Sequence, residues 1–156
     1  MISIKIPNRA AYNYDHLVLD YNGTLAIDGI PIEEVSALLA KLAQKLTVHV
    51  ITADTFGSVS RYFNNTNIHL KIISGKEQAK QKAEFVNSLN PKTVIAIGNG
   101  ANDGQMLKTA SLGIALIQAE GASLQALTNA DIVCTSIADA LNLVINPRRI
   151  SATLRE

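Results

Sequence analysis

Three segments of the chain place polar side chains directly after a run of apolar residues. Asp20 follows "HLVL", Thr52 ends "TVHVIT", and Asp103 comes shortly after "TVIAIG". A carboxylate can act as a covalent nucleophile, and carboxylate oxygens are the ligands that Mg²⁺ prefers. This chemistry requires a fold that brings the three segments together.

The pattern of apolar residues predicts such a fold. Short Val/Ile/Leu runs alternate with longer amphipathic segments, which is typical of a parallel sheet with helices on both faces. We therefore expect a Rossmann-like α/β fold, in which ligands bind beyond the carboxyl ends of the strands. The expected strands are 16–21, 47–52, 68–74, 93–98, 112–117 and 131–134, and the expected helices are 32–46, 55–65, 76–89, 101–110, 121–130 and 136–145.

The remaining segments complete one domain that spans residues 1–156, because no repeat, low-complexity stretch or linker divides the chain. The Asp28-Gly29 pair predicts a hairpin turn, and thus a short flap hairpin at about residues 22–31. The alternating "ISIKIP" (2–7) predicts an edge strand that ends at Pro7. The basic C-terminal stretch "NPRRISATLRE" is expected to be a solvated tail.

Composition excludes several classes of function. A net charge of +1 and the absence of Trp argue against a nucleic-acid-binding surface. The apolar runs are too short to span a membrane, so no membrane partner is expected. A single cysteine, Cys134, cannot form an internal disulfide, and no secretion signal is evident, which indicates the cytoplasm. The three histidines, at positions 16, 49 and 69, are expected to be structural.

Four segments together resemble the motifs of the haloacid dehalogenase superfamily. They are "DYNGTLA", "VITADT", a lysine within "KEQAKQKAEFV", and "GNGANDGQML". The resemblance is closest to the soluble P-type ATPase-like branch, and it runs from about Ile4 to Arg155. It implies a capless catalytic domain, since the segments between the motifs have room only for a hairpin, single helices and a strand.

The same resemblance implies a phosphatase or phosphotransferase that works through an aspartyl-phosphate and Mg²⁺. Asp20 would be the nucleophile. The metal ligands would be Asp20, the backbone carbonyl of Asn22, Asp103, and the position of Asn99, where the superfamily usually has Asp. Because Asn99 offers a neutral oxygen, we expect weaker metal binding than in an all-carboxylate site.

The resemblance also implies groups that bind the phosphoryl oxygens. Thr52 would donate its hydroxyl, and a lysine would neutralise the charge of the transferring group. Lys82 aligns best with the motif, while Lys80 and Lys76 on the same helix remain alternatives. The implied substrate-binding residues are Gly23, Thr24, Thr52, Ala53, Lys82 and Asn102.

Asn22 stands where haloacid dehalogenase phosphatases carry the Asp that protonates the leaving oxygen and activates water. An amide cannot carry a proton back and forth, and loss of a general acid–base costs about 10²–10⁴ in rate. We therefore expect a slow phosphohydrolase. The alternative is a regulatory protein that keeps a phosphate or Mg²⁺ pocket without catalysis. A phospho-receiver domain fits less well, because its acidic cluster and phosphorylated Asp occur in the reverse order along the chain.

A capless site predicts the kind of partner. It would be open to a small phosphorylated substrate or a phosphoprotein, or covered by a neighbouring subunit of a homo-oligomer.

Overall fold

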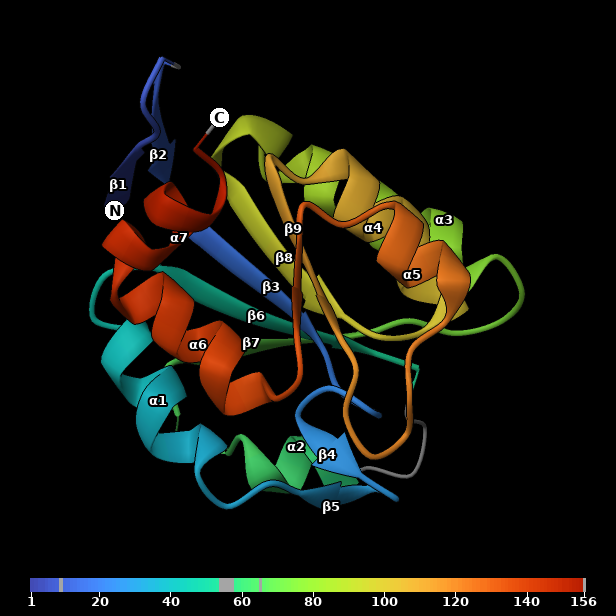
Figure 1. Ribbon diagram of the computed structural model, residues 1–156. Coiled ribbons are helices and arrows are strands. Elements are labelled where there is room, and N and C mark those ends of the chain that lie inside the picture. The colour runs from blue at the N-terminus through green and yellow to red at the C-terminus, as the bar shows by residue number, and fades with distance from the viewer. Residues whose placement is uncertain (9, 54–57, 65, 156) are drawn as a thin grey trace.

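The computed structural model describes residues 1–8, 10–53, 58–64 and 66–155 (Figure 1). Its centre is a parallel sheet of six strands in the order β10-β9-β8-β3-β6-β7. All six predicted strands form, several with slightly shorter ends, and the Rossmann-like α/β prediction is confirmed. The strands are β3 (His16–Asp20), β6 (Thr47–Thr52), β7 (Ile68–Ile72), β8 (Val94–Gly98), β9 (Leu112–Leu116) and β10 (Ile132–Cys134).

The central strands form because their side chains are apolar on both faces. Every residue of β8 and β9 is buried, as continuous Val/Ile/Leu runs require when helices cover a sheet on both sides. The two strands that pair with β3 come from distant parts of the chain. β3 pairs with β6, which follows it, and with β8, which comes much later. The carboxyl ends of these three strands therefore lie side by side, with Asp20 on the middle one.

The helices form two layers, one on each face of the sheet. In Figure 1, α3, α4 and α5 cover one face, and α1, α6 and α7 cover the other. The helices are α1 (Val35–Leu42), α2 (Ser58–Tyr62), α3 (Gln78–Ser88), α4 (Gly104–Thr109), α5 (Leu124–Thr128), α6 (Ile137–Ile145) and α7 (Pro147–Thr153), with 3₁₀ turns η1 (Pro91–Thr93) and η2 (Ala101–Asp103). Of the helix predicted at 55–65, residues 55–57 and 65 lie outside the described ranges. Among the described residues, no helix combines the length and the apolar character that a membrane span needs.

Both termini differ from the sequence-based expectation. The predicted N-terminal strand forms as β1 (Ile2–Lys5), but it pairs with β2 (Ala11–Tyr14) in a separate antiparallel hairpin. The prediction of a solvated C-terminal tail is wrong. The segment forms α7, which starts with a proline at its first helical position and buries Ile150. The Ser151 hydroxyl donates to the Lys5 carbonyl, so α7 is attached to β1.

The flap hairpin follows β3 almost at once. Its strands are β4 (Ala26–Ile27) and β5 (Ile30–Pro31), joined by Asp28 and Gly29 with φ of 51° and 75°. Positive φ at both turn residues is what a two-residue type I′ hairpin needs. In the described ranges, only this hairpin and α1 separate β3 from β6, and only α2 and β7 separate β6 from α3. The fold is thus capless, as expected.

Candidate active site

A buried cluster of three charged side chains lies at the carboxyl edge of the sheet. The Lys82 Nζ atom donates to Oδ1 of Asp20 and to Oδ1 of Asp103, at 2.6 Å in each case. The exposed fractions of the three residues are 1% for Lys82, 7% for Asp20 and 0% for Asp103. The structure therefore brings together residues that are 62 and 21 positions apart in the sequence.

Helix α3 selects the lysine. Lys82 and Val86, one helical turn apart, both face the protein interior and are buried. Lys76 and Lys80 are exposed, so neither lies in the buried cluster. Of the three lysines that the sequence left open, Lys82 is the one beside Asp20.

The turn after β8 holds Asp103 in place. Oδ2 of Asp103 accepts hydrogen bonds from the backbone N–H groups of Asn99 and Gly100, at 3.0 and 2.9 Å. Gly98 makes room for this carboxylate, because a Cβ atom at that position would lie 2.6 Å from Cγ of Asp103. Asp103 is thus fully enclosed and orients Lys82 toward Asp20.

The charges in the cluster do not balance. Two carboxylates share one ammonium group, and burial together with repulsion from Asp103 raises the pKa of Asp20 to about 7, against the lowering effect of Lys82. Burial opposes the charge on Lys82, but Asp20 and Asp103 raise its pKa above the usual value. Two carboxyl groups therefore compete for one ammonium group, and a bound cation would favour the ionised form of Asp20.

The donor atoms that Asp20 offers are carboxylate oxygens, the type of ligand that Mg²⁺ prefers. No group of three His, Cys, Asp or Glu side chains in the described part of the chain could hold a metal ion by itself. Mg²⁺ commonly uses one or two carboxylates and takes its other ligands from water and phosphate oxygens. Asp20, with Asp103 next to it, matches that limited requirement.

The two asparagines that replace expected carboxylates have different surroundings. The side chain of Asn22 is exposed in the turn after β3. Asn99 is 8% exposed, and its Oδ1 accepts from the Thr24 hydroxyl at 3.3 Å while its Nδ2 donates to the Gly121 carbonyl at 3.1 Å. The amide of Asn99 is therefore already engaged with protein groups.

The other residues predicted for the site differ in how deeply they are buried. Thr52 ends β6 and is buried. Because Asp20 pairs with Ile51, Thr52 lies one residue further along the neighbouring strand. Ala53 follows it and is partly exposed. Thr24 is fully enclosed. Asn102 donates to Oε1 of Gln78 at 3.1 Å, which ties η2 to α3.

The loop after β9 also contacts the turn that follows Asp20, and no residue of this loop was predicted for the site. Gln118 Nε2 donates to the carbonyls of Gly23 and Thr24, each at 2.8 Å. Glu120 accepts from the backbone N–H of Asp28 in the flap hairpin at 2.8 Å. The sequence did indicate this position, because Gln118 directly follows the strand predicted at 112–117 and so lies at the same edge of the sheet.

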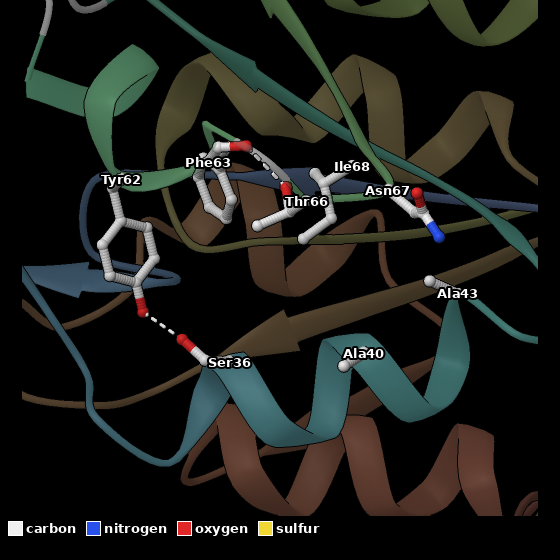
Figure 2. Close-up of a pocket in the computed structure, with 8 residues that line it drawn as sticks. All are labelled: Ser36, Ala40, Ala43, Tyr62, Phe63, Thr66, Asn67 and Ile68. Carbon is white, nitrogen blue, oxygen red and sulfur yellow. Dashed lines mark hydrogen bonds between the residues drawn. The ribbon is translucent and has the colours of Figure 1, made fainter.

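A separate cavity of about 300 Å³ lies between α1 and α2 (Figure 2). The hydroxyls of Ser36 and Tyr62 meet across it at 2.6 Å. None of the described residues that line this cavity is charged, so they offer no positive charge to neutralise a phosphate. Its lining residues are Ser36, Ala40, Ala43, Tyr62, Phe63, Thr66, Asn67 and Ile68.

Comparison with known proteins gives three kinds of match. A sequence model of a protein family, described as haloacid dehalogenase-like hydrolase, matches residues 5–140. An uncharacterized protein of Methanocaldococcus jannaschii is 50% identical over 74 residues, which are 47% of this chain and 80% of that protein.

Solved structures of similar fold include two that are named as octulosonate 8-phosphate phosphatases. The one from Moraxella catarrhalis, solved in complex with a magnesium ion, a phosphate ion and a KDO molecule, is 19% identical with a TM-score of 0.65, over 91% of this chain and 94% of that chain. The cobalt-bound one from Haemophilus influenzae is 12% identical with a TM-score of 0.70, over 92% and 94%.

The catalytic domain of a CPx-ATPase is also similar in fold. It is 24% identical with a TM-score of 0.60, over 74% of this chain and 46% of that chain. At these identities, the three structures show likeness of fold.

Proposed function

Because the chain belongs to the family of haloacid dehalogenase-like hydrolases, we propose that it is a magnesium-dependent phosphohydrolase that works through a phosphorylated Asp20. The observation that supports this most directly is the buried contact of Lys82 with both Asp20 and Asp103, at 2.6 Å each, at the carboxyl edge of the sheet. A carboxylate in this position can attack phosphorus, and the ammonium group beside it can neutralise the phosphoryl oxygens.

In the proposed reaction, an Asp20 oxygen forms a bond to phosphorus as the bond from phosphorus to the leaving oxygen breaks, and the leaving oxygen takes a proton from water. Water then attacks the phosphorus of phospho-Asp20, which releases inorganic phosphate and restores the Asp20 carboxylate. Lys82 stabilises the charge on the transferring group, and Thr52 donates a hydrogen bond to one of its oxygens. Asp103 keeps Lys82 in place. A bound Mg²⁺ would be held by Asp20, with Asp103 and the Asn22 carbonyl as further proposed ligands, and would supply positive charge to the phosphoryl oxygens.

The exposed amide of Asn22 makes this enzyme slow on some substrates. An alkyl leaving group needs a proton, and Asn22 cannot deliver one. Aryl and acyl phosphates have better leaving groups and depend less on that proton. We therefore expect the order of activity to be aryl or acyl phosphate above alkyl phosphate.

The proposed substrate is a small phosphorylated molecule. Two fold neighbours are named as phosphatases of a sugar phosphate, which supports the same class here, while a site without a cap also admits a phosphoprotein. We further propose a cytoplasmic location, from the single cysteine, and, as the alternative to an open site, a homo-oligomer in which a neighbouring subunit covers the site.

The first experiment compares wild type with Asn22→Asp on p-nitrophenyl phosphate and on an alkyl phosphate, with Mg²⁺. The introduced carboxylate restores a proton carrier, so turnover of the alkyl phosphate should rise by about 10²-fold and that of the aryl ester by less. Asp20→Asn should abolish both activities, and Asn129→Asp, a change of the same kind at the end of α5, should alter neither. Equal turnover of the alkyl phosphate by wild type and Asn22→Asp would refute the acid–base argument.

A phosphate-binding regulator is the second candidate, because the chain has amides at both Asn22 and Asn99. Beryllofluoride binding separates the two functions. Binding that requires both Mg²⁺ and Asp20, together with measurable turnover, supports the enzyme. Binding without turnover of any aryl, acyl or alkyl phosphate supports the regulator.

A further inference from the structure

Two amide side chains from different strand ends hold the turn that follows Asp20. We call Asn99, after β8, and Gln118, after β9, the amide clamp. Gln118 makes three hydrogen bonds: its Nε2 donates to the carbonyls of Gly23 and Thr24, and its Oε1 accepts from the backbone N–H of Ile137 at 2.9 Å. This one side chain thus connects the turn to the start of α6.

Asn99 contacts the same turn through the side chain of Thr24. It accepts from the Thr24 hydroxyl, donates to the Gly121 carbonyl, and accepts from the Ser123 N–H through its backbone carbonyl at 2.9 Å. The Gly121 carbonyl can only accept a hydrogen bond, so the nitrogen of the Asn99 amide must face it. Asn99 therefore joins the turn to the loop that carries Gln118.

Gly23 allows the close contact between the turn and the clamp. Its φ is +75°, and a Cβ atom there would lie 2.4 Å from Nδ2 of Asn99. The turn is also closed internally, because the Tyr21 carbonyl accepts from the N–H groups of Thr24, Leu25 and Ala26. These internal bonds keep the shape of the turn. If the bonds from Gln118 to the Gly23 and Thr24 carbonyls are lost, the turn therefore moves against the sheet mainly as a unit.

We infer that Asn99 and Gln118 are positioning residues that keep the turn at residues 21–25 in place beside Asp20, and that both positions require an amide. In this role Asn99 is not a weakened metal ligand. The inference deepens the proposed function, since the turn that is held carries the Asn22 carbonyl and directly follows the proposed nucleophile. Glu120 extends the same connection to Asp28 in the flap hairpin.

A carboxylate cannot replace either amide. Asp at position 99 keeps the bond from Thr24 but loses the bond to Gly121, and it places a negative charge against that carbonyl. Glu at position 118 keeps the bond from Ile137 but loses both bonds to the turn. Asn99→Asp and Gln118→Glu therefore test the clamp without a large change of side-chain volume.

Hydrogen exchange measured by mass spectrometry tests, without any assay of activity, whether Asn99 and Gln118 hold the turn in place. In Asn99→Asp and in Gln118→Glu, exchange in both 21–31 and 117–123 should be about tenfold faster than in wild type, as the loss of about one hydrogen bond predicts. Asn129→Asp is the matched control, because its amide also donates to a backbone carbonyl, that of Gln125, at 2.8 Å on the surface. Unchanged exchange in these two segments would overturn the inference.

Kinetics and metal binding test whether Asn99 and Gln118 position the turn for the reaction. With p-nitrophenyl phosphate, both clamp variants should lower kcat about tenfold or more while KM changes less than about twofold, because a displaced turn misaligns the reacting groups. Unchanged kcat in stable variants would show a merely structural role. Mg²⁺ titrated by calorimetry should bind Asn99→Asp no more tightly than wild type, and binding about tenfold tighter with unchanged exchange would make Asn99 a ligand position instead.

The two proposals fail in different ways. If wild type has no turnover, the proposed phosphohydrolase is wrong, and hydrogen exchange alone decides whether the clamp exists. If Asn99→Asp does not fold, Gln118→Glu, whose side chain is only partly buried, carries the same test.

Discussion

Lys82 sets the charge balance of the candidate site. It is buried between two buried carboxylates, and the position of α3 leaves its ammonium group no access to water. Removal of one partner from a buried ion pair leaves the other charge uncompensated, which is far more costly than loss of a surface pair. The role of Lys82 in stability and its proposed role in catalysis therefore come from the same contacts.

Lys82→Met keeps the length of the side chain and removes its charge. We expect the free energy of unfolding, measured with urea and without added metal, to fall by about 3–5 kcal/mol. Turnover of p-nitrophenyl phosphate should fall by about 10²–10³-fold. Lys80→Met on the same helix is the control, because Lys80 is exposed and should change neither quantity. Equal effects at both positions would show that α3 does not direct Lys82 into the site.

At the scale of elements, α7 shows how a basic segment becomes part of the core. "NPRRISATLRE" has few apolar residues, and its charges suggest solvent exposure. The structure buries Ile150, 1% exposed, between this helix and the rest of the core, and the arginines at 148 and 149 remain outside. Two apolar residues, Ile150 and the partly buried Leu154 at the end of the helix, are sufficient because β1 and α6 already provide a surface for them.

Ile150→Ala should therefore destabilise the whole protein and not only its C-terminus. The expected loss in the free energy of unfolding is about 2–5 kcal/mol, from buried methyl groups and the cavity they leave. Leu124→Ala is a suitable control, since Leu124 is 77% exposed and its truncation should cost little. If Ile150→Ala unfolds with the wild-type midpoint in urea, α7 does not belong to the cooperative core.

At the scale of the whole molecule, three histidines from three strands form a row beneath α3. Nδ1 of His16 and Nε2 of His49 are 3.2 Å apart, and the rings of His49 and His69 have centroids 5.4 Å apart. Phe85 of α3 packs edge-on against His49, with ring centroids 5.3 Å apart. Burial, with His16 and His69 nearby, lowers the pKa of His49 from 6.5 to about 4.

This row predicts acid sensitivity. Between about pH 6.5 and 4 the unfolded chain binds a proton at position 49 that the folded protein does not, so stability decreases as the pH falls through this range. The contribution is up to about 3 kcal/mol. Asp20, whose pKa is raised, makes stability increase as the pH falls, which opposes the effect of His49. The contribution of His49 is therefore measured as the difference in stability between wild type and His49→Leu.

Urea unfolding at several pH values from 4 to 7.5 measures that difference. His49→Leu should lose less stability than wild type at the acid end. His69→Leu, which removes an exposed ring from the same row, should follow the wild-type curve more closely. A wild type and a His49→Leu variant with parallel curves would contradict a buried neutral His49.

The strands and the edge of the sheet where the polar residues gather could be predicted from the sequence. Runs such as 94–98 and 112–116 are apolar at every position, which is typical of a strand covered on both faces. The hairpin at Asp28-Gly29 was equally predictable, because few residue pairs adopt two positive φ angles. These features depend on neighbours within a few residues, so the local sequence was sufficient to specify them.

Contacts across the molecule depended on the tertiary structure. Lys82 and Lys80 differ little in their local sequence, and only the way α3 packs on the sheet buries one and exposes the other. The partners of Asn99, the bonds from Gln118 to the turn after Asp20, and the attachment of α7 to β1 likewise join segments up to 146 residues apart. Side-chain burial and hydrogen-bond pairing at such separations follow from packing, and local residue preferences contain no information about them.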